Sequence, residues 1–136
     1  MADNNAKQIA ANIDKVAMVD LPQALTRGLE KACLTIERSA KANAPGHGTG
    51  NLRSSITHKV VLDTGYVFST IDYAPYVEAG TGIHATMGSR AKKIPWVYCD
   101  AAGNWHTTSG MTARPFLKPA RDSNISAIMK CFEGLI

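Results

Sequence analysis

The segment from Asp72 to Gly82, DYAPYVEAGTG, constrains the fold of this chain more than any other. Pro75 fixes its φ angle at about −65° and lacks an N–H donor, whereas Gly80 and Gly82 can adopt backbone angles that are closed to other residues. An extended run that reaches this segment must therefore stop and turn. We expect Pro75 to begin a short helical turn and Gly80 to end it in the left-handed region.

The length of 136 residues is typical of one domain, so we expect residues 1–136 to form a single domain. Hydrophobic residues make up 45% and charged residues 19%, as in ordinary globular proteins, and no apolar run predicts a membrane span. The first twenty residues predict no signal peptide. A net charge of +4 is too small to indicate a dedicated nucleic-acid binder. The three scattered cysteines predict core thiols in a reducing compartment.

Apolar side chains at helical spacing predict two helices in the first third of the chain. The first, from about Asn4 to Ala17, has a narrow apolar stripe, so residues 1–20 are expected to be a mobile helix or to dock on a neighbouring copy. The second begins after the N-cap residue Asp20, carries Pro22 in its first turn and ends near Asn43. We interpret its polar face as solvated, with Glu37 and Lys41 at the spacing i, i+4 that supports the helix locally.

Alternating apolar residues and turn signals predict two hairpins after a glycine-rich joint. The first pairs a strand at Ser54–Leu62 with one at Tyr66–Ile71 across a turn at Asp63–Gly65, and the second pairs IPWVYCD with NWHTTS. A last helix is expected over Leu117–Phe132. We therefore predict an α+β fold in which a long N-terminal helix and a C-terminal helix pack on an antiparallel sheet of about four to five strands.

Few polar residues converge on a reaction. The histidines and cysteines show none of the spacings of a zinc site, so we predict no metal, no cofactor and no catalytic residue. A hydrolase that uses His106 and nearby acids is the least favoured alternative. Another alternative is a small basic nucleic-acid-binding module that uses Arg90, Lys92, Lys93 and the aromatic second hairpin, because phosphate contacts add to affinity. These cations lie in the segment 82–93, which we expect to be an exposed loop and which is equally well explained as solvated.

Three segments carry a resemblance to a known family: APGHGTGNLRSSI at 44–56, YAPYVEAGTG at 73–82 and ARPFLKPA at 113–120. In order and spacing they resemble the tail-component family of long-tailed double-stranded DNA bacteriophages, also called head–tail joining, neck or tail-completion proteins. The resemblance covers roughly residues 21–133. Ala79 stands where that family usually has Phe. The resemblance implies a small α+β subunit with no catalytic activity.

The resemblance also implies a place in the virion. It implies a structural protein of a phage or prophage that assembles in the host cytoplasm into a ring, with a hexamer as one option, at the junction of capsid and tail. Implied partners are further copies of the chain, the head-closure or connector ring, and the tail-terminator or tail-tube proteins. DNA would pass through the channel, close to the protein, and no membrane would be involved.

Residues for the subunit interfaces follow as a hypothesis. We expect the 82–93 loop and the joint at 46–50 to order against neighbouring subunits. Arg53, Glu78 and Arg114 are expected to form charge pairs that set subunit register, although local ion pairs within one subunit explain them equally well. The full set of interface candidates is Arg53, Tyr73, Tyr76, Glu78, Arg90, Lys92, Lys93, Arg114 and Phe116.

Overall fold

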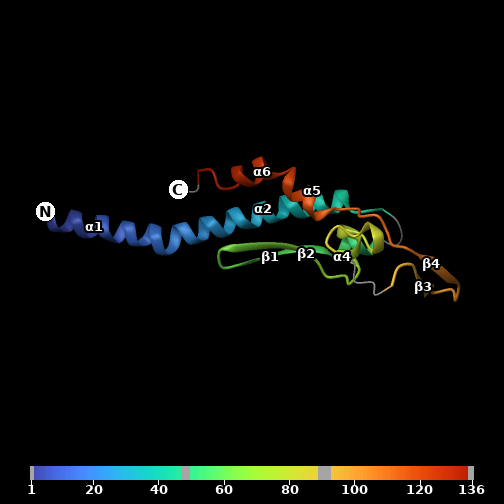
Figure 1. Cartoon of the computed structure of the whole chain (residues 1–136). Helices are drawn as coiled ribbons and strands as arrows, with labels where there is room; N and C mark the ends of the chain where they lie inside the picture. The colour runs from blue at the N-terminus through green and yellow to red at the C-terminus, as the bar shows by residue number, and fades with distance from the viewer. Residues whose placement is uncertain (1, 47–49, 89–92, 135–136) are drawn as a thin grey trace.

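A long helical rod organises the fold in this computed structural model, which describes residues 2–46, 50–88 and 93–134 (Figure 1). The rod consists of helix α1 (Ala2–Lys15), a π-helical turn η1 (Val16–Asp20) and helix α2 (Leu21–Asn43). At 1.5 Å per residue it is roughly 60 Å long. Both predicted helices are confirmed. The predicted N-cap is wrong, because Asp20 has helical angles of φ −69° and ψ −44° and its side chain caps nothing.

Pro22 accounts for the π-helical turn. A proline inside a helix cannot donate to the carbonyl four residues before it, and its ring clashes with that carbonyl. In η1 the N–H of Leu21 bonds instead to the carbonyl of Val16, which widens the turn just before the proline. The rod therefore continues through residues 18–20, where the sequence predicted a gap between two helices.

A hairpin lies along one side of α2 (Figure 1). Strand β1 (Ile56–Val61) pairs antiparallel with β2 (Thr64–Ser69), and Val61 lies opposite Thr64. The predicted turn at Asp63–Gly65 is wrong by about a residue, since Leu62, with φ 56°, and Asp63 form a two-residue turn. Gly65 is needed in the strand because a Cβ there would collide with the sulfur of Cys33 on α2.

Two short helices lie on the opposite side of α2 (Figure 1). They are α5 (Leu117–Asp122) and α6 (Ile125–Lys130), where a single helix was predicted. The break follows from side-chain donors that compete for helix carbonyls: Ser123 Oγ donates to Pro119 and Asn124 Nδ2 donates to Ala120, both at 2.6 Å. The chain then brings the Phe132 ring against Gly28 of α2, where a Cβ would lie 2.8 Å from it.

The predicted sheet of four to five strands is not confirmed. The described residues form two separate two-stranded sheets, because β3 (Trp96–Cys99) pairs only with β4 (Trp105–Thr108). Helix α4 (Ala74–Ala79) and the 3-10 turn η2 (Gly82–His84) lie between β2 and β3 in the chain. This turning segment leads the second hairpin away from the first, so that β3 and β4 project at the far end of the molecule (Figure 1).

The joint before β1 is partly helical. Helix α3 (Asn51–Ser55) follows Gly50, whose φ is 76°, so β1 begins at Ile56 rather than at the predicted Ser54. Residues 47–49 of the joint lie outside the described residues. β2 ends at Ser69, two residues before the predicted end, where the serine hydroxyl accepts the N–H of Ile71 at 3.3 Å.

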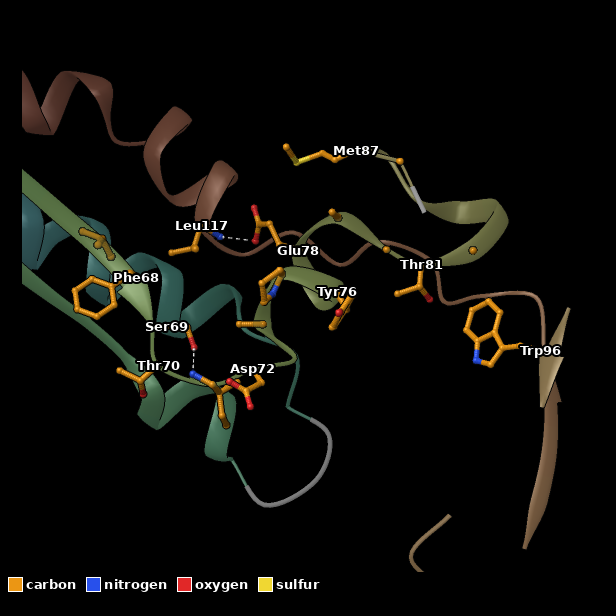
Figure 2. Close-up of a pocket in the computed structure, with 18 of the residues that line it drawn as sticks. Phe68, Ser69, Thr70, Asp72, Tyr76, Glu78, Thr81, Met87, Trp96 and Leu117 are labelled. Carbon is orange, nitrogen blue, oxygen red and sulfur yellow. Dashed lines mark hydrogen bonds between the residues drawn. The ribbon is translucent and has the colours of Figure 1, made fainter. Parts of the chain in front are cut away.

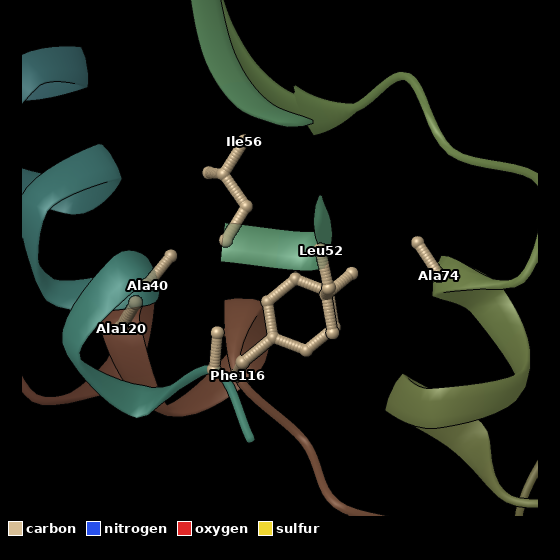
Figure 3. Packing of buried hydrophobic residues seen from close by; sticks show 7 residues of the cluster. Ala40, Leu52, Ile56, Ala74, Phe116 and Ala120 are labelled. Atoms are coloured by element: carbon tan, nitrogen blue, oxygen red, sulfur yellow. The ribbon is translucent and has the colours of Figure 1, made fainter. Parts of the chain in front are cut away.

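The core lies near the C-terminal end of α2, where all three segments of the family resemblance meet (Figure 3). Phe116 and Ile56 are its largest fully buried side chains. The ring of Phe116 lies among aliphatic and small side chains, and the alanines let the backbones approach closely. The buried cluster consists of Ala40, Ala44, Leu52, Ile56, Ala74, Phe116 and Ala120.

Candidate functional site

The bend at residues 72–82 holds the returning chain at residues 109–118. The N–H of Thr81 donates to Met111 at 2.9 Å, the N–H of Ile83 to Ser109 at 2.9 Å, and the N–H of Arg114 to Val77 at 2.8 Å. Backbone lies so close that a Cβ at position 80 or 82 would collide with it. The predicted turn is confirmed, with α4 beginning at Ala74 and ending before Gly80, although Gly80 has φ 75° with an extended ψ of 177°.

Glu78 is partly buried and caps helix α5. Its Oε2 accepts the N–H groups of Phe116 and Leu117 at 2.7 and 3.0 Å, and its Oε1 accepts that of Lys118 at 2.9 Å. A carboxylate suits this place because the first N–H groups of a helix have no partner within the helix. The described ion pairs involve neither Glu78 nor the exposed Arg53 and Arg114.

The other interface candidates differ in exposure. Phe116 is 0% exposed and belongs to the core, so its side chain is not presented on the subunit surface. Tyr73 and Tyr76 are 46% and 39% exposed. Lys93 is exposed, whereas Arg90 and Lys92 lie outside the described residues. Within the 82–93 segment, η2 starts the loop and the N–H of Thr86 donates to Ala79 at 2.8 Å.

An open groove of about 1200 Å³ lies beside α4 (Figure 2). The end of β2, α4, the residues after η2 and the start of β3 form its walls. Its surface is mainly apolar, with Asp72 and Lys93 as charged residues besides the capping Glu78. The larger side chains of the lining are Phe68, Ile71, Tyr76, Met87, Trp96 and Leu117. Such a surface can accept several apolar side chains from a partner.

The N-terminal part of the rod presents a second apolar surface. Ile9 and Ile13 are 59% and 61% exposed, and Met18 in η1 is also exposed. Within the described chain, the extensive contacts of α1 are with η1, its own continuation. Apolar side chains in this number on an unpacked helix face are typical of an association surface.

A third exposed surface is the β3–β4 hairpin, which carries the residues of the hydrolase alternative. His106 Nε2 lies 2.8 Å from Asp100 and its ring stacks on Tyr98. Asp100 also accepts the N–H groups of Ala102 and Asn104, at 2.9 and 2.8 Å, as a turn-forming residue does. The hydrogen bond from His106 is the main reason why the pKa of Asp100 is lowered. This geometry assigns Asp100 to the turn.

A cluster of ionisable side chains lies between α2 and β1, and the sequence predicted only its Glu37–Lys41 pair. His58 Nδ1 bonds to Glu37, His58 Nε2 lies 3.1 Å from Glu30, and Lys41 Nζ lies 2.6 Å from Glu37. The hydrogen bond with Glu37 raises the pKa of His58, and the same bond, followed by that from Lys41, lowers the pKa of Glu37. Glu30 and Glu37 are seven residues apart and so share a helix face, which was the available signal. Part of the polar face of α2 is therefore packed rather than solvated.

No helix in the described chain combines the length and the apolar character that crossing a membrane would require. The fold and its surfaces define an α+β protein built on one long helix, with apolar surface exposed at both ends of the rod. Residues 7–80 match the HK97-gp10-like family model, described as bacteriophage HK97-gp10, a candidate tail component. The match spans more than half of the chain, and the protein belongs to this family.

Family membership indicates a structural, virion-associated phage protein. The match covers the rod from Lys7 onward, the first hairpin and α4, and it ends at Gly80, so the segment at 113–120 lies outside it. No curated protein and no solved structure matches the chain.

Proposed function

We propose that this protein is a structural subunit of a ring at the head–tail junction of a long-tailed phage or prophage, where it joins the DNA-filled capsid to the tail. The ring consists of copies of the chain, with a hexamer as one option. Its other partners are the head-closure or connector ring and the tail-terminator or tail-tube proteins. Membership of a phage tail-component family supports a structural role.

The observation that carries the proposal is the unpartnered N-terminal part of the rod. The N-terminal part of the rod, which includes α1, extends beyond the part of α2 that the hairpin and the C-terminal helices cover (Figure 1). An amphipathic helix gains most of its stability when its apolar face is packed against something. A subunit that extends such a helix away from its own core is suited to contacts with other subunits.

The test is removal of the gene from the phage or prophage that encodes it. We expect the lysate to contain separate DNA-filled heads and finished tails when viewed by electron microscopy. Supplying the wild-type protein should restore joined, infectious particles. Joined and infectious particles formed without the protein would overturn the proposal, and so would a block before the heads are filled or the tails are finished.

A further inference from the structure

We propose that α1 of one copy lies in the groove of a second copy, so that the same contact repeats from subunit to subunit. This inference rests on the proposed function, which requires a ring, and it names the contact between subunits that would form that ring. The acceptor is the groove lined by Phe68, Ile71, Tyr76, Met87, Trp96 and Leu117 (Figure 2). The donor is the apolar face of α1.

The apolar residues of the donor face have the spacing of helices that bind in apolar grooves. Ala6, Ile9, Ala10 and Ile13 occupy positions i, i+3, i+4 and i+7, the pattern of helices that lie in apolar grooves. All four residues are exposed in the single subunit. The two alanines let the helix backbone approach a wall, and the two isoleucines supply the buried area. The face extends over about 10 Å along the helix axis.

The acceptor groove complements this face in polarity and charge. Its surface is mainly apolar, and it carries one exposed acid, Asp72, and one exposed base, Lys93. Lys7 and Asp14 are exposed, lie two helical turns apart and border Ala10 on the edge of the donor face. Pairing of Lys7 with Asp72 and of Asp14 with Lys93 would place opposite charges together and set the direction of the helix.

The positions of the two surfaces require a second copy. The groove lies beside α4, whereas α1 is at the opposite end of the rod (Figure 1). A contact between two different surfaces is heterologous, and it produces a closed ring when the rotation between neighbours closes. A contact of α1 with α1 would instead pair the same surface twice and would leave the groove unused.

The experiment measures self-association of the full-length chain by sedimentation and native mass spectrometry. The wild type should form oligomers, and Ile9→Glu with Ile13→Glu should weaken association at least about tenfold. Asn4→Glu with Ala11→Glu is the matched control, because it adds the same two negative charges at exposed positions on the opposite side of α1, and its association should equal that of the wild type. Unchanged circular dichroism would show that the variants remain folded.

Charge exchange tests which surface receives the helix. Lys7→Asp and Asp72→Lys should each weaken association, and the two together should restore most of it. The proposal is overturned if the wild type stays monomeric at its highest soluble concentration, if the Ile9 and Ile13 variant associates normally, or if the double exchange restores nothing. If oligomers form that are insensitive to these substitutions, the α1–groove contact is wrong and the head–tail role still holds. If normal virions form without the protein, the head–tail role alone is wrong.

Discussion

At the scale of single residues, Glu78 connects two segments that are far apart in the sequence. One carboxylate accepts three backbone N–H groups at the start of α5, directly beside the buried Phe116. Hydrogen bonds to a charged group contribute more to stability than neutral ones. Glu78 thus positions the residue that fills the core, a role that its place near a turn did not reveal in the sequence.

We predict that Glu78→Ala lowers the free energy of unfolding by about 1–3 kcal/mol. Glu78→Gln should cost less, because its amide oxygen can still accept one or two of the N–H groups. Glu133→Ala, at an exposed position near the C-terminal end, should stay within about 0.5 kcal/mol of the wild type. Urea unfolding followed by circular dichroism measures all three, and equal values for Glu78→Ala and Glu133→Ala would contradict the capping role.

The His58 cluster predicts how stability depends on pH. The pKa of His58 is raised in the folded chain, so its contribution is complete below the unfolded value of about 6.5 and is lost as pH rises through the folded pKa. The pKa of Glu37 is lowered, so its contribution is complete above about 4.3 and is lost as pH falls through the folded pKa. Between these two limits the cluster stabilises the hairpin on α2 most.

We therefore expect the free energy of unfolding to fall by about 1 kcal/mol or less as pH rises above 6.5. His58→Gln should remove this dependence, because no ring remains to titrate. His84→Gln changes an exposed histidine and should keep the wild-type profile. Denaturant unfolding over a pH series gives the comparison, and an unchanged slope in His58→Gln would show that another group is responsible.

At the scale of elements, the hairpin depends on a glycine for its distance from α2. A Cβ on Gly65 would collide with the sulfur of Cys33. Burial is the main reason why the pKa of the Cys33 thiol is raised. The sequence placed this glycine in the turn because D-T-G is a strong turn signal. In the structure Gly65 belongs to β2, because it packs against α2, and the turn is formed one residue earlier, beginning at Leu62 with a positive φ.

We predict that Gly65→Ala destabilises the protein by about 1–3 kcal/mol through overpacking. Gly46→Ala is the control, since a Cβ there meets nothing within 4 Å, and its effect should be small. Combining Gly65→Ala with Cys33→Ala should cost less than the sum of the two single changes, because removal of the sulfur makes room. Thermal or urea unfolding of the four proteins tests this, and strict additivity would contradict the contact.

At the scale of the whole molecule, local patterns predicted most elements but not their arrangement. The helical periodicity before residue 43 and the alternation of the two hairpins were sufficient for the α+β class. The four strands do not form one sheet because α4 and the turns after it, fixed by contacts with residues 109–118, lead β3 and β4 away. Such long-range contacts have no local signature. The groove was also unpredictable, since the placement of β2, α4 and the start of β3 around it depends on the same long-range contacts.

The net charge of the protein predicts a low affinity for nucleic acid. With +4 distributed over 136 residues, we expect the isolated protein to bind DNA weakly and with a shallow dependence on salt. A gel-shift titration at several salt concentrations measures this. Tight binding with a steep salt dependence would favour the basic nucleic-acid-binding module over the ring subunit.

The distance between the core and the start of the rod has a consequence for proteolysis. The buried cluster involves no residue before Ala40, so peptide bonds near Lys7 and Lys15 can be cut without disturbing it. Brief trypsin treatment should leave a shortened fragment that unfolds at almost the same temperature as the intact chain. This fragment should no longer self-associate. Mass spectrometry of the digest identifies the fragment and calorimetry measures its thermal unfolding. The expected result would show that one part of the chain is needed for folding and another part for self-association.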